Sequence, residues 1–286
     1  RVATRRLHDT RADHGACYLK PQGETLLRFV QLLCDRGILQ VWTDTVSKFS
    51  VQNCEFSISQ SPRYVAPDGM SAIAKFLAQD LEIRLNQRVE AITPHSNSYW
   101  FLDTSSNTIT QPPLTALAVV VAIPAPQALM LLQLAENGLP EIFLEQLRSI
   151  EFDPCFSVIA GYPADLHQTP DWKAITFVDD SDLGWIGLDS SKRKETKPLV
   201  FVLQSSADFA RKHLEAEDLQ LLGHQLLTRA SECLLPWLAD PEWMQVHRWR
   251  YAFPSHPLQA TYLSAATELP LVCCCDWCGG NLIESA

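Results

Sequence analysis

Arginines crowd the start of this 286-residue chain, where Arg1, Arg5 and Arg6 precede an Ala-Asp-His-Gly-Ala segment at 12–16. A guanidinium presents a planar fork of donors that matches phosphate oxygens, so these side chains can pair with a pyrophosphate. Gly15 would let the backbone approach a flat ring closely, because glycine has no Cβ. A basic terminal strand followed by a turn explains the same residues, and composition alone favours that second interpretation.

A Cys-x-x-Cys pair, Cys275 and Cys278, lies close to the other end of the sequence. Tetrahedral zinc needs four ligands, and the sequence offers no second pair of cysteines or histidines at a suitable spacing. A thioredoxin-type pair would open a helix within a βαβ unit, which does not follow here. In a different interpretation the thiols are incidental, a buried strand at 269–274 carries Asp276 at its tip, and Gly279–Gly280 open a helix. The carboxylate would then accept hydrogen bonds from ligand hydroxyls, and the helix N–H groups would hold an electron-rich group.

The segment HRWRYA, which begins at His247, has the residue types of a strand. Alternation places His247, Trp249 and Tyr251 on one face and Arg248 and Arg250 on the other. One face can therefore line an aromatic pocket, although core aromatics with exposed arginines fit the same spacing. The sequence has no G-x-S-x-G, H-E-x-x-H or G-x-x-x-x-G-K motif, and no carboxylate pair stands out for acid–base chemistry. We therefore assign no catalytic side chain.

Composition limits the class of protein. A balance of 23 basic against 33 acidic residues gives a formal charge of −10, which argues against a general nucleic-acid binder. Only 11 glycines are present and no G-x-G-x-x-G occurs, so the usual dinucleotide fingerprint is missing. The nine cysteines are odd in number and mostly scattered, which indicates a reducing, cytoplasmic compartment rather than a disulfide framework.

An uncharged, apolar stretch at 114–135 could be mistaken for a membrane span. Pro124 and Pro126 interrupt it, whereas a spanning helix needs about 20 consecutive apolar residues. We expect a buried strand at 117–123, then a turn and a helix at 126–134. The run Val119–Val121 is apolar on successive residues, which predicts a parallel strand covered on both faces.

Apolar spacing predicts the remaining elements. The expected helices lie at 24–36, from 68 or 71 to about 81, and at 216–235. The expected strands lie within 38–59 and at 83–85, 88–92, 99–102, 156–162, 174–177, 184–188, 199–204, 245–251 and 269–274. The charged run at 191–197 is expected to be a solvated loop.

Taken in order, these segments resemble the renalase-like branch of the flavin-containing amine oxidase superfamily. Arg1–Arg6 is similar to the family's M-A-T-R-R segment with Val2 in place of Met. Asp13–Tyr18 is similar to D-H-G-A-Q-Y with Cys17 in place of Gln, and Cys275–Ala286 to the closing G-D-W-C-G-G-x-x-x-E-G-A. Further matches are G-M-S-A-I at Gly69–Ile73, N-x-R-V at Asn86–Val89, A-I-P-A-P-Q at Ala122–Gln127, D-S-S-K at Asp189–Lys192 and H-R-W-R-Y-A at His247–Ala252.

The resemblance implies an α/β fold in which an FAD/NAD(P)-binding, Rossmann-like domain carries an inserted substrate domain built on a mixed, mostly antiparallel sheet. The cofactor domain would take residues 1–20, 66–134 and 269–286, and the substrate domain residues 21–65 and 135–268. The family's first strand, G-x-G-x-x-G turn and first helix would precede Arg1, and a C-terminal helix would follow Ala286. We therefore expect an incomplete cofactor domain.

The resemblance also implies a reaction, hydride transfer from a small reduced substrate, of dihydronicotinamide type or an amine, to FAD, with reoxidation by O₂. Neither nucleic acid nor a membrane is an expected partner, and no metal is expected. Two alternatives stay open: a folded remnant that has lost its flavin, and a dithiol or metal protein using Cys275 and Cys278. The implied FAD contacts are Arg1, Arg5, Asp13, His14, Gly15, Val89, Pro124, Asp276, Trp277, Gly279, Gly280 and Glu284, and the candidate substrate contacts are His247, Trp249 and Tyr251.

Overall fold

The computed structural model describes residues 2–95, 98–105, 114–133, 138–165, 168–194, 198–280 and 283–285. The chain forms two compact units. The first combines Arg1–Gln79 with Asp153–Ala252, and the second combines Asp80–Phe152 with Phe253–Ala286. The predicted cofactor and substrate domains divide the chain at other residues, and their assignment stays a prediction.

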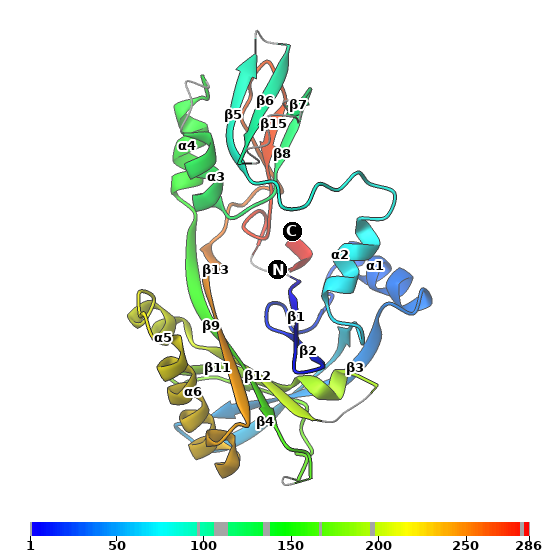
Figure 1. Ribbon diagram of the computed structural model, residues 1–286, viewed down its shortest axis with the longest axis vertical. Helices are drawn as coiled ribbons and strands as arrows, with labels where there is room; N and C mark the ends of the chain where they lie inside the picture. Colours follow the sequence, from blue (N-terminus) through cyan, green and yellow to red (C-terminus); the bar gives the residue numbers. More distant parts are fainter. Residues whose placement is uncertain are drawn as a thin grey trace. The chain divides into compact units, whose positions relative to one another are not determined.

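A mixed sheet organises the first unit, with seven strands among the described residues (Figure 1). Its order is β13-β9-β12-β11-β10-β3-β4. The β3–β4, β10–β11, β11–β12 and β12–β9 pairs are antiparallel, and β10 pairs with β3 in parallel. The predicted mixed, mostly antiparallel sheet is confirmed. The strands are β3 (Gln40–Ser50), β4 (Glu55–Val65), β9 (Glu151–Tyr162), β10 (Ala174–Phe177), β11 (Leu183–Leu188), β12 (Leu199–Ser205) and β13 (Trp243–His256).

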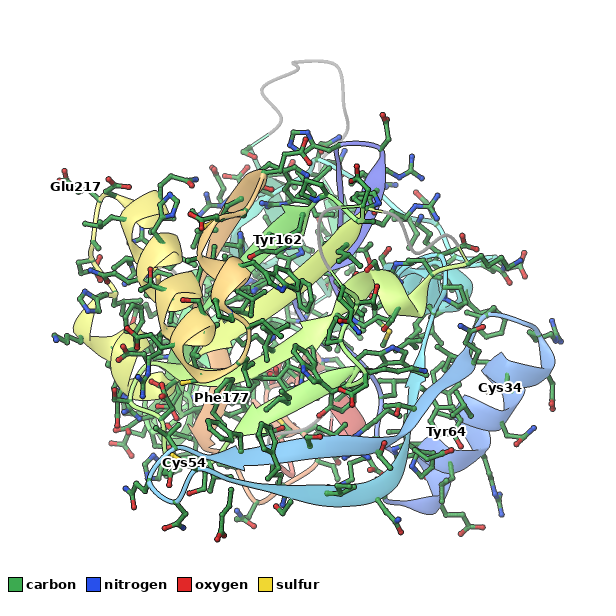
Figure 2. The ribbon with its side chains drawn as sticks, turned by 90° about the horizontal axis from the view of Figure 1, so that it is seen from below. Cys34, Cys54, Tyr64, Tyr162, Phe177 and Glu217 are labelled. Atoms are coloured by element: carbon green, nitrogen blue, oxygen red, sulfur yellow. The ribbon has the colours of Figure 1, made fainter. Side chains whose placement is uncertain are left out.

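Helices α5 (Ala207–Lys212) and α6 (Leu219–Cys233) cover one face of this sheet (Figure 2). Helix α6 begins later than predicted because the Asp218 side chain caps it, accepting hydrogen bonds from the backbone N–H groups of Gln220 and Leu221. Its apolar face packs into a core with the sheet strands, in which Tyr162 and Phe177 also lie. Burial of each such large apolar side chain contributes about 1.5–3 kcal/mol.

Short elements complete the first unit. Strands β1 (Thr4–Leu7) and β2 (Thr10–Asp13) form an antiparallel hairpin. Its two turn residues, His8 and Asp9, have φ of 45° and 61°, as a tight type I′ turn requires. Helix α1 (Glu24–Asp35) ends close to Gly37, which has a φ of +67° as expected of a helix stop signal. The others are α2 (Ser71–Leu77) and the 3₁₀ turns η1 (Asp189–Lys192) and η2 (Pro236–Ala239).

The second unit contains two three-stranded sheets among its described residues, in the orders β5-β6-β7 and β14-β15-β8. Strands β8 and β15 are parallel, with Val120 opposite Val272, so the predicted parallel strand is confirmed. Its elements are β5 (Val89–His95), β6 (Tyr99–Thr104), β7 (Leu114–Ala116), β8 (Val119–Val121), α3 (Ala125–Leu132), α4 (Glu141–Arg148), β14 (Leu263–Ser264), β15 (Leu271–Cys273) and the 3₁₀ turn η3 (Ile283–Ser285).

Three expectations about local structure are wrong. Val119 and Val121 are buried, but Val120 is 63% exposed, so only one face of β8 is covered. Residues 83–85 form no strand, because an apolar run without a hydrogen-bonding partner cannot become one, and Leu85 is 77% exposed. The charged run that begins at 191 is not solvated throughout: Lys192 is completely buried, and residues 195–197 of that run lie outside the described part. Among the described residues no helix has the length and apolar character needed to cross a membrane.

Candidate functional site

A buried group of four charges anchors the segment that follows the first hairpin. Asp13, at the end of β2, lies 2.8 Å from the Arg193 guanidinium and 3.5 Å from the Lys192 ammonium. Asp189 in η1 completes the group, at 2.5 Å from Lys192 and 2.9 Å from Arg193. We call these four residues the charge quartet. Two acids and two bases make it neutral, which is what burial of charge requires.

The surroundings of the quartet fix Asp13 further. Its Oδ1 accepts hydrogen bonds from the Thr4 hydroxyl at 2.7 Å and from the Met70 N–H at 2.8 Å. Burial alone would raise the pKa of Asp13, but Lys192 and Arg193 outweigh it, so the pKa is lowered. Burial would likewise lower the pKa of Lys192, and the two neighbouring carboxylates raise it instead. Burial raises the pKa of Asp189, although Lys192 and Arg193 oppose that shift. The ion pairs and hydrogen bonds of the quartet join β1, β2, the start of α2 and η1.

The next residue, His14, is 5% exposed and lies within a cluster of rings. Its ring centroid is 5.4 Å from Trp249, in a stacked arrangement, and 5.0 Å from His247, edge-on. His247 and Trp249 are themselves 4.2 Å apart. The structure therefore brings together one predicted cofactor contact and two predicted substrate contacts, and Tyr251 lies two residues further along β13, half-buried.

The electrostatic environment keeps the His14 imidazole neutral. Burial, the Arg5 guanidinium and His247 together lower the pKa of His14 to about 4. The Nδ1 atom of His14 is buried and has no hydrogen-bond partner among the described residues. Arg5 lies on β1, opposite Ala12 in the hairpin, and Arg1 lies outside the described residues. A neutral ring with an unused nitrogen beside a cation is suited to a polar ligand group.

The backbone carbonyl oxygens of the segment 13–15 accept hydrogen bonds from side chains of the first unit. The His14 oxygen accepts hydrogen bonds from the Ser157 hydroxyl at 2.8 Å and from the Trp249 indole N–H at 2.9 Å. The Gly15 oxygen accepts one from the Gln204 carboxamide at 3.0 Å. The Cys17 thiol donates to the Asp13 oxygen at 3.2 Å. Side chains from β9, β12 and β13 therefore hold the segment 13–15 at a fixed orientation.

In the second unit the predicted contacts concentrate at 276–280. Trp277 is completely buried, and its indole N–H donates to the carbonyl oxygen of Ile123 at 3.1 Å. The following turn contains Gly279 at a φ of +72°, a left-handed conformation that favours glycine. Asp276 and Gly280 are half-buried on either side of this turn. The left-handed turn at Gly279 therefore coincides with a position at which we predicted a cofactor contact.

The remaining predicted contacts of the second unit lie on other elements. Pro124 precedes α3, and its carbonyl accepts the N–H groups of Gln127 and Ala128 at 2.9 Å. Val89 opens β5 and packs against the apolar core of this unit, which contains Trp277. Glu284 lies in η3. The helix predicted to open at Gly279–Gly280 is not observed at those two glycines, and residues 281 and 282 lie outside the described part.

The cysteine residues near Asp276 do not have the properties of a reactive dithiol. Cys273 and Cys278 are fully buried. Burial raises the pKa of Cys273 to about 12 and that of Cys275 to about 11, which keeps the thiols protonated and poorly nucleophilic. Within the described part of the chain no three His, Cys, Asp or Glu side chains converge to hold a metal ion. The dithiol and metal alternatives therefore gain no structural support.

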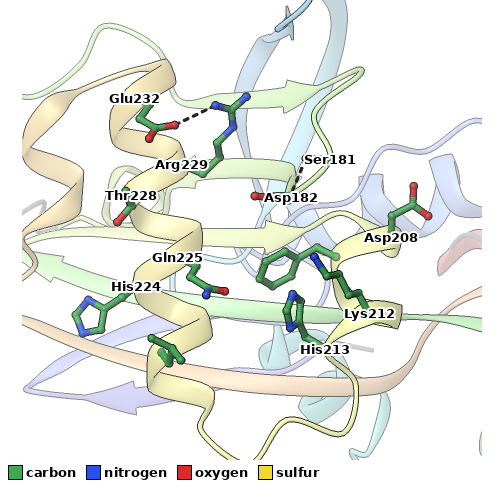
Figure 3. Close-up of a pocket in the computed structure, with 12 residues that line it drawn as sticks. Ser181, Asp182, Asp208, Lys212, His213, His224, Gln225, Thr228, Arg229 and Glu232 are labelled. Atoms are coloured by element: carbon green, nitrogen blue, oxygen red, sulfur yellow. Dashed lines mark hydrogen bonds and ion pairs between the residues drawn. The ribbon is translucent and has the colours of Figure 1, made fainter.

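A surface groove of about 740 Å³ lies elsewhere in the first unit, between α5, α6 and the 181–182 turn (Figure 3). Its acidic and basic side chains are mixed, and Arg229 is already paired with Asp180 at 2.8 Å and with Glu232 at 3.0 Å. Mixed and paired charges favour a solvated surface over a site for one class of ligand. The lining consists of Ser181, Asp182, Asp208, Phe209, Lys212, His213, Leu221, His224, Gln225, Thr228, Arg229 and Glu232.

Sequence reasoning missed the side chains that support the segment 13–15. Ser157 and Gln204 lie on strands that were predicted, but nothing in a single sequence shows what their polar groups face. Lys192 offered a signal, because Asp189 lies three residues before it and directly follows a buried strand. Only the folded chain shows that this pair meets Asp13.

Comparison with known proteins shows which family this chain belongs to. Residues 17–268 match the family model for flavin containing amine oxidoreductases. This match covers most of the chain, which therefore belongs to that family, and membership implies a flavin cofactor. The chain is 27% identical over 232 residues to renalase from Mus musculus, covering 78% of this chain and 63% of that relative. It thus spans less than two thirds of the relative's length.

Solved structures show the same fold. Putrescine oxidase bound to putrescine matches with a TM-score of 0.67 and 11% identity, over 100% of this chain and 88% of that chain. A putative protoporphyrinogen oxidase from Exiguobacterium sp. 255-15 matches with a TM-score of 0.51 and 16% identity, over 68% of this chain and 42% of that chain. The chain therefore has the α/β fold of flavin-dependent amine oxidases, with a Rossmann-like part.

Proposed function

We propose that this chain is part of a renalase-like oxidoreductase that uses FAD. Bound FAD would supply the redox chemistry by accepting a hydride from a small reduced substrate, of dihydronicotinamide type or an amine, and passing the electrons to O₂. The observation that carries the proposal is the geometry of the segment 13–15. Side chains of the sheet hold the carbonyl oxygens of His14 and Gly15, and the Nδ1 atom of His14 has no hydrogen-bond partner among the described residues.

The residues of each unit fit the cofactor in their own way. In the first unit, Arg5 would neutralise phosphate charge, and His14 and Gly15 would present a polar edge without a bulky side chain between them. In the second unit, the Asp276 carboxylate would accept hydrogen bonds from polar groups of the cofactor. Gly279, which has a left-handed backbone and no side chain, would let the backbone approach the cofactor closely. Trp249 and Tyr251 would contact the substrate. The nine free thiols are consistent with a cytoplasmic location.

The test is flavin binding by the purified chain. After incubation with FAD and removal of unbound flavin, we expect retained absorption near ~450 nm that is characteristic of protein-bound flavin. Arg5→Ala and Asp276→Ala should weaken retention, whereas Arg211→Ala, an exposed arginine on α5, should not. A chain that folds but retains no flavin would support the remnant alternative instead.

A further inference from the structure

Three polar side chains on adjacent strands converge on two consecutive carbonyl oxygens. The donors are Ser157 on β9, Gln204 on β12 and Trp249 on β13, and the acceptors are the oxygens of His14 and Gly15, at 2.8–3.0 Å. The sheet order is β13-β9-β12, and Gln204 lies directly opposite Ser157 in the register. The donors therefore come from three neighbouring strands, whose arrangement in the sheet is drawn in Figure 1.

This arrangement determines which way the peptides face. A trans peptide is planar, so its N–H points away from its C=O. Because the oxygens of His14 and Gly15 point at the three donors, the N–H groups of Gly15 and Ala16 point to the opposite side. Gly15 adds no side chain on that side. Two successive N–H donors beside the neutral His14 ring would suit an electron-rich edge, such as a ring carbonyl oxygen.

We propose that Ser157 and Gln204, together with Trp249, are positioning residues that hold the 14–16 peptides so that their N–H groups face the flavin. The inference rests on the proposed function, since it assumes that segment 13–16 contacts FAD. Ser157 is completely buried and its hydroxyl donates into this loop, so its role is to orient the loop and not to touch the ligand.

Matched variants separate positioning from general stability. Ser157→Ala removes the hydrogen bond to the His14 oxygen, and Gln204→Leu removes the one to the Gly15 oxygen together with a longer contact, of 3.8 Å, to the Cys17 thiol. Ser205→Ala removes a buried hydroxyl that accepts the Phe156 N–H at 3.0 Å, and Gln245→Leu changes a glutamine on β13 whose buried Oε1 has no partner among the described residues. The control variants alter the same sheet without touching the loop.

Two readouts apply to each variant, the dissociation constant for FAD and the titration of the His14 ring in flavin-free protein by NMR. We expect Ser157→Ala and Gln204→Leu to weaken FAD binding about fivefold each, the equivalent of one hydrogen bond of roughly 1 kcal/mol. A loosened loop also lets water reach His14, so its pKa should rise toward the ordinary value. The control variants should change neither quantity, even where urea unfolding shows an equal loss of stability.

The outcomes distinguish this inference from the proposed function. If the parent chain binds FAD and all four variants bind equally well, the positioning role is overturned. Weakening of the same size in the controls also overturns it. If the parent chain binds no FAD, the proposed function fails, and the His14 titration alone then decides whether Ser157 and Gln204 hold the loop.

Discussion

Asp13 and Arg193, 180 residues apart in the sequence, form an ion pair of 2.8 Å in which the carboxylate is completely buried. Arg193 also donates to the carbonyl oxygen of Ala66 at 2.9 Å. One guanidinium therefore joins the end of the first hairpin to the segment before α2. The very next residue, His14, is a proposed ligand contact.

Removal of one cation from the charge quartet should be costly. Lys192→Met leaves two buried carboxylates with a single guanidinium, and such an uncompensated charge costs about 3–5 kcal/mol. Urea unfolding at neutral pH measures the loss. The double variant Lys192→Met/Asp189→Asn restores neutrality and should recover part of it. A single variant as stable as the parent chain would show that the quartet is not charged.

The free energy of unfolding should decrease as the pH falls, because His14 takes up a proton more readily in the unfolded chain than in the folded one. The unfolded ring binds a proton below its ordinary pKa of about 6.5, whereas the folded ring, with its pKa lowered to about 4, does not until the pH is much lower. Unfolding therefore takes up a proton between these values, and its free energy decreases as the pH falls from 6.5 to 4, by up to about 1.4 kcal/mol per pH unit.

The variant His14→Gln removes this titration. We expect its unfolding free energy to depend less steeply on pH than that of the parent chain between pH 4 and 6.5, measured by urea unfolding at a series of pH values. The comparison uses slopes, so a uniform loss from missing ring contacts does not disturb it. Equal slopes in the two proteins would mean that His14 is protonated as easily in the folded state as in the unfolded state.

The thiols should react in two classes. Burial raises the pKa of Cys17 and that of Cys155 to about 12, and Cys273 is equally inaccessible. Cys54, in the turn between β3 and β4, is exposed. We expect a thiol reagent at mildly alkaline pH to label Cys54 rapidly and the buried three only after unfolding, as mass spectrometry of labelled peptides would show. Fast labelling of Cys275 or Cys278 would instead revive the dithiol alternative.

Gly69 should tolerate no side chain. It has a φ of +98°, and a Cβ there would collide with the Thr4 side chain, which itself holds Asp13. Gly69→Ala combines backbone strain with overpacking, for a cost of about 2–4 kcal/mol. Gly37→Ala is the matched control, because its φ is +67° but its Cβ would meet no described atom within 4 Å. Thermal unfolding should show a clearly larger loss for Gly69→Ala, and equal losses would contradict the packing argument.

Periodicity sufficed for the elements whose side chains meet only the core. The helix at 24–36 and the strand at 174–177 appear within a residue of their expected ends, because apolar spacing alone determines them. The expected strand at 83–85 failed, since strand formation also needs a partner and sequence spacing shows none. The prediction that Val120 is buried failed for a similar reason, because an apolar run does not show whether anything covers the second face of its strand.

The part of the candidate site that matches a sequence motif was predictable. The side chains that hold it in place were not, because they are distant from it in the sequence. Segment 13–15 was found from its resemblance to a family motif. Its partners Ser157 and Gln204 lie more than 140 residues away in the sequence, and each belongs to a strand whose spacing describes burial only. Lys192 was assigned to solvent because charge runs usually are, and the two carboxylates that offset its burial come from separate segments.

The neutrality of the quartet has a consequence for how this sequence can change over generations. No single substitution that removes or reverses a charge at Asp13, Asp189, Lys192 or Arg193 preserves the balance, so a lineage that loses one of these charges must pass through an unstable intermediate. The four charges should therefore be inherited as a set, with each relative keeping all of them or losing an acid together with a base. A survey of related sequences that showed the four varying independently would indicate that something else offsets the buried charge.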